Sequence, residues 1–470
     1  MKFKKPSIFT KTKKIPELRF DDSSTQSLTS FSGLVTYQFL FQRLHLSNRL
    51  KECFVGQKQN LVYECHSVVL LLIIHLSLGY KWLRDITYYK DDPMVQRVLG
   101  LKRLPDVSTI SRTLKIVNDD SADRLKDLSK EIVIQRLENL DLSIITLDFD
   151  GSVLSTSRHA QGTAVGYNKK KKGARSYYPL FCTVAQTSQI LDFYHRPGNV
   201  HDSNGAVEYA SQIVEEIRKS LPKTIIESRT DSAFFNEDQL DEWNDCGVEF
   251  TASVPFERFS ELKQKIESRK RWNKIDDTWS FFEENWSPSS WDAKYRFVFV
   301  RQKVKKQLKG PIQLELFVPV NMDFEYKVIV TNKKRSAKDI LMFHNGRGSQ
   351  EAIFAEAKTN ANMEYIPVKK LNGNKTYLLS AILAHNLHKE MQINTYEKDR
   401  GHTKKRSPLW KFESLSIFRK NVLQRAGRLI KPQGRLTLVM SKCDKVKKVI
   451  TDILESPVGS FKPSLPTDKI

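Results

Sequence analysis

The alternation of strands and helices in the middle of this 470-residue chain is the feature that most constrains its fold. Residues 144–150, Ile-Ile-Thr-Leu-Asp-Phe-Asp, have the composition of a buried strand, and a Gly-Ser turn follows them. The expected elements run in the order strand, strand, strand, helix, strand, helix, strand, over residues 144–150, 177–185, 190–194, 206–220, 224–231, 237–244 and 248–254. This order predicts an α/β layer, and sites in such layers usually lie at strand ends. Two of the strands end in acids, Asp150 and Asp231.

The regions around this layer differ from it in composition. A chain of this length is too long for a single core. Four of the seven tryptophans fall between the strand at 248–254 and residue 340, which indicates an inserted, mainly β subdomain. The expected divisions are a basic arm at 1–30, a helical DNA-binding region at 31–140, the α/β core at 141–256, the β insertion at 257–340, the rest of the core at 341–395 and a basic helical tail at 396–470.

The charge of the chain points to a polyanionic partner. It has 77 basic and 54 acidic residues, a net charge of +23 and a pI near 9.6, so nucleic acid is the first candidate. The longest apolar run, 68–78, is too short to cross a bilayer, and no apolar segment follows the basic start as a secretory signal would require. Five cysteines without paired spacing fit a reducing cytosol and argue against zinc fingers and disulfides. We therefore expect a cytoplasmic protein that acts on DNA or RNA and does not enter membranes.

A helical hairpin within the N-terminal region has the outline of a helix-turn-helix. A short helix, Met94 to Leu99, is ended by Gly100, and a second helix over 106–115 has a polar face that includes Arg112. Ordinary packing of two helices gives the same pattern, so both interpretations stay open. On the first, Arg112 is a candidate for DNA contact.

A helix after the insertion carries an acid between two cations. At about 100° per residue, Arg347, Glu351, Phe354 and Lys358 form one narrow stripe on a single helix face. Such a face can place a carboxylate on a metal while the cations hold phosphates. Glu356 lies about 140° around the helix from Glu351 and is not expected to share the site. Taken alone, the stripe also fits a solvated helix with ordinary charge pairs.

Three acids, Asp150, Asp231 and Glu351, together favour a metal site. Their carboxylates suit Mg²⁺ or Mn²⁺, and two such ions roughly 3.5–4 Å apart can clamp both oxygens of an in-line phosphoryl transfer. A lone acid at a strand end is more often a turn former or a helix cap. Three in this order on a basic chain make that explanation insufficient. Asp148 shares strand parity with Asp150 and is the rival for the first acid.

These residues resemble a known family, the DDE transposases of bacterial insertion sequences. Its Tyr-Arg-Glu-Lys signature has intervals of two, three and six residues, and the chain keeps them at His344, Arg347, Glu351 and Lys358, with His in the Tyr position. Residues 148–152 resemble the strand that carries the family's first acid, and residues 229–232 the segment that carries its second. The resemblance covers about residues 140–395.

The resemblance implies a ribonuclease H-like fold with a β insertion between the second Asp and the Glu. It implies Mg²⁺-dependent cutting at the inverted-repeat ends of the element and joining to target DNA, by a homodimer on paired ends in the bacterial cytoplasm at the nucleoid. By position, Asp150, Asp231 and Glu351 would bind the metal, and Arg347 and Lys358 would hold DNA phosphates.

Further DNA contacts are expected outside the acids. His344 could donate a hydrogen bond to phosphate, with a charge that depends on pH. A lysine run that includes Lys170 and Lys171, together with Arg175, lies between the first two expected strands. Such a run is usually a solvated loop, but beside a metal site on a basic protein we expect backbone contact.

Three functions compete. The first is a transposase that binds terminal inverted repeats and cuts and joins DNA with two divalent ions. The second is a nuclease of similar fold without transposition, and the third is a DNA-binding regulator whose acids no longer catalyse. All three acids and both flanking cations are present, which favours an enzyme. Specific binding to paired ends separates the first from the second, and metal-dependent cleavage separates both from the third.

Overall fold

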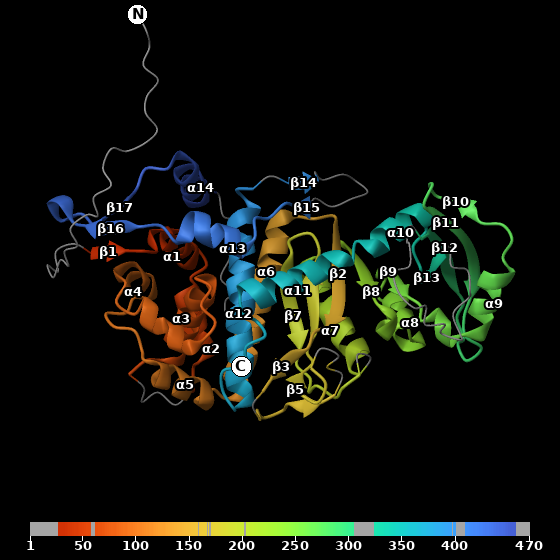
Figure 1. Cartoon of the computed structure of the whole chain (residues 1–470), viewed down its shortest axis with the longest axis horizontal. Coiled ribbons are helices and arrows are strands. Elements are labelled where there is room, and N and C mark those ends of the chain that lie inside the picture. The colour runs from red at the N-terminus through yellow and green to blue at the C-terminus, as the bar shows by residue number, and fades with distance from the viewer. Residues whose placement is uncertain are drawn as a thin grey trace, which may run out of the picture.

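The computed structural model describes residues 27–57, 62–157, 159–166, 168, 171–201, 204–304, 324–396, 398–400 and 409–456. Along its long axis a helical region is followed by an α/β core and then by the β insertion (Figure 1). Among the helices of the described part, none has both the length and the apolar character to cross a membrane.

The core is built on one mixed sheet. Its strands are β2 (Ile144–Gly151), β6 (Leu180–Val184), β7 (Gln189–Tyr194), β8 (Ile225–Thr230) and β9 (Glu249–Ser253). They lie in the order β7-β6-β2-β8-β9. The central β2, β8 and β9 are parallel, while β6 and β7 are antiparallel to their neighbours. This is the ribonuclease H-like arrangement, and the expected α/β fold class is confirmed.

The insertion extends this sheet instead of forming a sheet of its own. Its strands are β10 (Asn273–Lys274), β11 (Trp279–Trp286), β12 (Tyr295–Lys303) and β13 (Phe324–Thr331). They form an antiparallel series, and β13 pairs with β9, giving nine strands in one sheet. The helix α9 (Ser260–Ser268) lies beside them (Figure 1). The sequence predicts an inserted, mainly β subdomain here, but it gives no sign of which strand edge β13 joins.

The two faces of the core sheet differ in chemistry because side chains alternate along each strand. One face carries apolar side chains such as Leu147, Phe149 and Phe250, which form a core with α7 (Ala206–Ser220) and α8 (Glu237–Asp245). The other face carries polar side chains on all three parallel strands: Thr146, Asp148, Asp150, Glu227, Arg229, Glu249, Thr251 and Ser253.

Three helices cover the polar face: α10 (Ala337–Asn345), α11 (Gly348–Asn360) and α12 (Leu371–Ile393). α12 lies between the core sheet and the N-terminal helices, and most of its side chains are buried. Its Asn386 pairs with the backbone of Ile190 on the edge strand β7, accepting at 2.9 Å and donating at 2.7 Å. Polar side chains of α12 can be buried here because they form hydrogen bonds with backbone groups at the edge of the sheet.

The N-terminal region is helical, as its periodicity predicts. Its helices are α1 (Val35–Arg43), α2 (Leu46–Cys53), α3 (Cys65–Ser77), α4 (Pro93–Leu99), α5 (Val107–Ile116) and α6 (Asp119–Leu140). The apolar run that is too short to cross a bilayer forms most of α3, which is buried on all sides. Short strands follow β2: β3 (Leu154–Thr156), β4 (Ala164–Val165) and β5 (Arg175–Tyr177), which form a small sheet.

The segment after residue 395 differs from the mostly helical tail that we expected. It contains β14 (Lys398–Arg400), β15 (Leu409–Trp410), α13 (Leu415–Phe418), β16 (Gly427–Ile430), β17 (Thr437–Met440) and α14 (Asp444–Glu455). β16 pairs with β17 and with β1 (Ser27–Thr29), from the other end of the chain. The tail therefore returns to the N-terminal helices (Figure 1).

Candidate active site

Asp150 and Asp231 both lie where neighbouring parallel strands of the core sheet end, Asp150 on β2 and Asp231 directly after β8. In the β2–β8 register each residue pairs with the one 81 positions later, as in Asp148 with Arg229. The pairing ends at that point, and the same offset of 81 positions relates Asp150 to Asp231, each two residues further along its chain segment. Asp231 also begins the 3₁₀ turn Ser232–Phe234, where its Oδ1 accepts from the Ala233 N–H at 2.9 Å. In this position Asp231 has the turn-forming role that is common for an acid at a strand end.

Arg347 joins this pair of acids from the helices that cover the polar face. Its Nη1 lies 3.7 Å from Asp150 Oδ2, and both side chains are about one-fifth exposed. The expected single helix is divided at this point: α10 ends at Asn345, and Arg347 is the N-cap of α11. A cation beside the first acid can hold a phosphate close to it.

Glu351 lies in the first turn of α11 with its side chain exposed, whereas Phe354 of the expected stripe is buried against the sheet. Within the described ranges, no three His, Cys, Asp or Glu side chains are close enough together to hold a metal ion. Among the described residues, therefore, the three expected acids do not form a group that could hold a metal ion. The oxygens of the two aspartates suit a hard divalent ion, so the donor chemistry fits, with Arg347 as the competing partner of Asp150.

The rival acid, Asp148, has a different environment. It is fully buried, and Arg229 grips both of its oxygens, with Nε–Oδ1 at 2.7 Å and Nη2–Oδ2 at 2.6 Å. Burial raises the pKa of Asp148 above its usual range, and the Arg229 charge opposes that rise. A carboxylate with both oxygens occupied is not available to a metal, which favours Asp150 as the first acid.

His344 is buried within the fold. Its Nδ1 is 3.0 Å from Thr251 Oγ1 and its Nε2 is 2.9 Å from Ser253 Oγ, both on β9. Burial, reinforced by Lys327 and Arg347, lowers its pKa to about 3. The imidazole is neutral near pH 7, and both ring nitrogens are engaged. This geometry favours attachment of α10 to β9 over the expected contact with phosphate.

The other expected DNA contacts are spread over the molecule. Lys358 Nζ donates to the Val153 carbonyl, just after β2, at 3.3 Å. Arg175 on β5 is bound to Thr163, while Lys171 is exposed and Lys170 lies outside the described residues. Arg112 is exposed on α5 in the helical region. Of these expected contacts, Arg347 binds Asp150 on β2 and Lys358 binds the backbone just after that strand.

Two polar residues at the site were missed from the sequence. Arg229 holds Asp148, and Gln350 Nε2 donates to the Asp148 carbonyl at 2.7 Å while its own side chain is fully buried. One signal could have identified Arg229. It lies 81 residues after Asp148, the interval that separates Asp150 from Asp231, and the parallel pairing of the two strands brings Arg229 to Asp148.

The core is a ribonuclease H-like sheet that carries one expected acid on β2 and another directly after the neighbouring parallel strand β8. The family model described as "Transposase DDE domain group 1" matches residues 13–456, and the chain belongs to this family. It is therefore a DNA transposase of the DDE type. Enzymes of this type generally use divalent metal ions.

Similar solved structures come from two transposases. The chain is 12% identical to the piggyBac transposase in a synaptic complex with hairpin DNA, covering 85% of this chain and 82% of that one at a TM-score of 0.39. It is 13% identical to the Mos1 transposase in a paired-end complex with the left transposon end, covering 36% and 56% at a TM-score of 0.17. A pre-cleavage Mos1 transpososome gives 12% identity, 36% and 57% coverage and a TM-score of 0.17. No curated protein matches the chain.

Proposed function

We propose that this transposase binds the terminal inverted repeats of a bacterial insertion sequence as a homodimer, cuts there in the presence of Mg²⁺ or Mn²⁺, and joins the ends to target DNA. The observation that carries the proposal is the position of Asp150 at the end of β2, 3.7 Å from Arg347, with Asp231 directly after the neighbouring parallel strand β8. Family membership supports the reaction class.

The proposed ligands of two ions are Asp150, Asp231 and Glu351. When bound, such ions activate the attacking oxygen and stabilise the leaving oxygen of a phosphoryl transfer. Glu351 is exposed in the first turn of α11, so it can approach the aspartates if that turn shifts toward them. Asp150 and Asp231 hold the site, and Arg347 exchanges its partner from Asp150 to a DNA phosphate.

The roles of the cations follow from their positions. Arg347 and Lys358 lie near β2 and its continuation, so we assign them to phosphates at the cut. Lys171 and Arg112 are exposed farther from the acids and would contact flanking DNA backbone. Contacts to phosphates carry no sequence information, so none of these cations is assigned to the recognition of the repeat sequence.

The test uses purified protein, Mg²⁺ and labelled DNA taken from the flanks of its own gene. Asp150→Asn, Asp231→Asn and Glu351→Gln are compared with wild type, with Glu364→Gln as a matched control. Glu364 is a surface acid whose Oε1 lies 3.7 Å from the Nζ of Lys81, a residue of the helical region. We expect cutting at a fixed terminal position by wild type and the control, and a loss of at least about 10³-fold in the three site variants.

Each alternative predicts a different result. Cutting without preference for a paired end would support a nuclease without transposition. Specific binding to the ends without cutting in either Mg²⁺ or Mn²⁺ would support a regulator. Cutting that persists in Asp231→Asn and Glu351→Gln would show that the site is elsewhere.

A further inference from the structure

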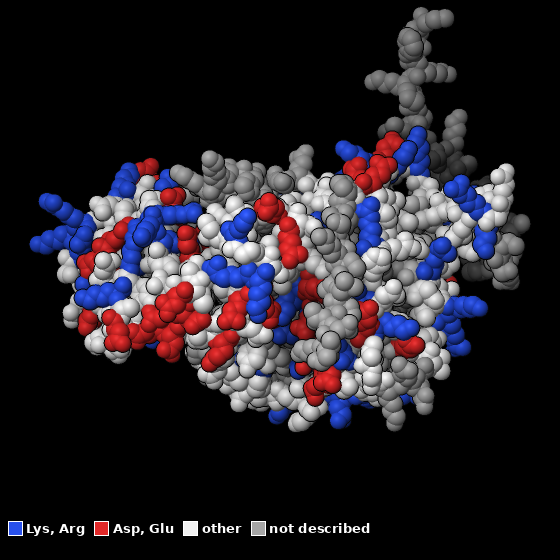
Figure 2. Space-filling model, turned by 180° about the vertical axis from the view of Figure 1, so that it is seen from behind, with Lys and Arg blue, Asp and Glu red and all other residues white. Residues whose placement is uncertain are grey.

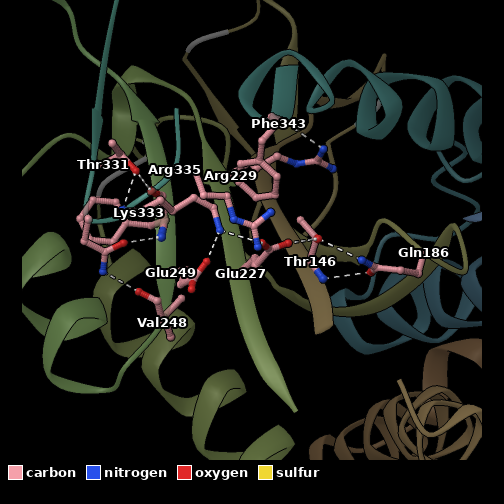
Figure 3. A network of polar contacts seen from close by, with 12 residues as sticks. Thr146, Gln186, Glu227, Arg229, Val248, Glu249, Thr331, Lys333, Arg335 and Phe343 are labelled. Atoms are coloured by element: carbon pink, nitrogen blue, oxygen red, sulfur yellow. Dashed lines mark hydrogen bonds and ion pairs between the residues drawn. The ribbon is translucent and has the colours of Figure 1, made fainter. Parts of the chain in front are cut away.

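A layer of paired charges is buried between the polar face of the sheet and α10. Lys333, just after β13, is fully buried, and its Nζ donates to Glu227 on β8 at 2.7 Å and to Glu249 on β9 (Figure 3). The other oxygen of Glu227 accepts from Thr146 Oγ1 at 3.1 Å, and Gln186 donates to that hydroxyl at 3.0 Å. Each charge in this layer therefore has a partner, as burial requires.

The ring of Phe343, near the end of α10, lies against two cations of this layer. The Lys333 Nζ is 4.5 Å from the ring centroid, and the Arg229 Cζ is 5.3 Å from it. Arg229 Nη1 also donates to the Phe343 carbonyl at 3.3 Å. Cation–ring contacts are stronger away from water, and here both cations are buried while the ring of Phe343 is half-buried. The end of α10 is thus held through both its side chain and its backbone.

The same Arg229–Asp148 pair also contacts the start of α11. A Cβ added at Gly346 would lie 2.2 Å from Arg229 Nη1, so the backbone between the two helices packs directly on the guanidinium. On the other side of the junction, Gln350 donates to the Asp148 carbonyl at 2.7 Å. The junction between α10 and α11 is therefore fixed to the sheet on both sides of Arg347.

We propose that Arg229 is a positioning residue: paired with Asp148 and in contact with the ring of Phe343, it fixes the α10–α11 junction so that Arg347 is held beside Asp150. Arg229 itself is two residues before Asp231 but does not touch the reacting groups. Reactive groups must be held to within a fraction of an ångström, and a misplacement of about 1 Å can cost roughly 100-fold in rate. The effect on catalysis rests on the proposed function, whereas the fixing of the junction does not.

The test replaces the charged pair by a neutral pair of similar size, Asp148→Asn with Arg229→Gln. Hydrogen exchange of residues 343–353 is measured on the full chain without DNA, followed by single-turnover cleavage of end DNA in Mg²⁺. We expect exchange over 343–353 to rise about tenfold while α7, on the opposite face of the sheet, is unchanged. Cleavage at saturating DNA should fall roughly 100-fold, with the DNA Kd within about threefold of wild type.

A matched control removes a buried ion pair elsewhere. Arg136 on α6 donates to both oxygens of Glu390 on α12 at 2.9 Å, and Arg136→Gln with Glu390→Gln leaves a neutral pair there. This variant should lose thermal stability to a similar degree, with wild-type exchange over 343–353 and wild-type cleavage. Arg229→Lys keeps the charge but loses the bidentate contact with Asp148. Its exchange over 343–353 and its cleavage rate should lie between those of wild type and those of the neutral pair.

Unchanged exchange over 343–353 in the neutral pair, or an equal rise over α7, would overturn the proposal. Because exchange is measured without DNA or metal, it tests the fixing of the junction even if no DNA is cut. Absence of cleavage by wild type, combined with the expected exchange, would refute only the proposed function. If the neutral pair does not fold, Phe343→Leu replaces it: the leucine fills the space without the ring, and unaltered exchange at the junction would again overturn the proposal.

Discussion

Asp148 and Asp150 are separated by one residue of the same strand, yet their surroundings make them different kinds of carboxylate. Asp148 is buried in a two-pronged contact with Arg229, whereas Asp150 is at the strand end with part of its side chain in solvent. A local pattern cannot distinguish them, because both share the same strand parity. The partner that distinguishes them, Arg229, is distant in the sequence.

This difference predicts opposite effects of substitution. Asp148→Ala leaves the Arg229 charge buried without its partner, and we expect a loss of about 3–5 kcal/mol in the free energy of unfolding. Asp150→Ala removes a partly exposed contact and should change stability by less than about 1 kcal/mol while abolishing metal-dependent cleavage. Urea unfolding, followed by the cleavage assay, measures both. Equal losses of stability in the two variants would contradict the assignment.

His344 predicts a pH dependence of stability. Its pKa falls from 6.5 to about 3 on folding, mainly because it is buried. Below pH 6.5, His344 of the unfolded chain binds a proton that His344 of the folded chain does not bind. The contribution of His344 to stability is therefore fully present above pH 6.5 and is lost as the pH falls toward 3. Lowering the pH from 7 to 5 should therefore reduce the contribution of this group to the free energy of unfolding by about 2 kcal/mol.

Urea unfolding of wild type and His344→Gln at several pH values measures that contribution, because the other buried histidines are common to both proteins. The difference in free energy of unfolding between the two proteins should shift by this amount over the two pH units. A difference that does not vary with pH would show that folding does not change the pKa of His344.

At the scale of elements, helices with regular apolar periodicity, such as α6 and α7, could be predicted from the sequence, since their spacing is a local property. The division between α10 and α11 and the strands of the tail could not. β16 pairs with β1, so that Ser27 lies opposite Leu429, and no local pattern encodes a partner about 400 residues away. The attachment of the β insertion at β9 could not be predicted either, because the pairing of β13 with β9 also joins residues that are far apart in the sequence.

Arg419 provides a test of how the helical region is attached to the core. Its guanidinium donates to the Ser77 carbonyl at the end of α3 at 2.8 Å and to the Asn360 carbonyl at the end of α11 at 2.7 Å. Arg419→Met should cost about 2–4 kcal/mol, since it leaves carbonyls of two buried helix ends without a donor. Arg218→Met is the control, because Arg218 caps only the end of α8 at a part-exposed position.

For that control we expect a loss of no more than about 1 kcal/mol. Urea unfolding measures the two losses, and hydrogen exchange at the ends of α3 and α11 locates them. Exchange that rises at one helix end alone in Arg419→Met would show that the guanidinium does not join the two regions.

At the scale of the whole molecule, a net charge of +23 is not concentrated on the face seen in Figure 2. On that face lysines and arginines alternate with groups of acids, so the overall charge alone does not locate a DNA surface (Figure 2). The prediction of a polyanionic partner depends on composition, but the path of the DNA depends on which cations the fold brings to one side.

Salt dependence tests whether α5 lies on that path. Arg112 is exposed on this helix and makes contacts within its own turn. If it binds a phosphate, Arg112→Ala should weaken binding to all sequences alike and reduce the slope of log K against log salt by about 0.9. Titrations of end DNA and unrelated DNA at several salt concentrations measure it. An unchanged slope would place α5 away from the DNA backbone.

The sequence by itself determined the α/β class, the strand-end acids and the helical character of the N-terminal region, because strand alternation, helical periodicity and turn residues act over a few neighbouring positions. Only the tertiary structure decided which aspartate is exposed, how His344 is buried and how the α10–α11 junction is held. Those outcomes depend on contacts such as Arg229 with Asp148 and Phe343, across 81 and 114 residues. Burial and pairing of charges are set by what lies nearby in space, and only folding of the whole sheet brings these residues together.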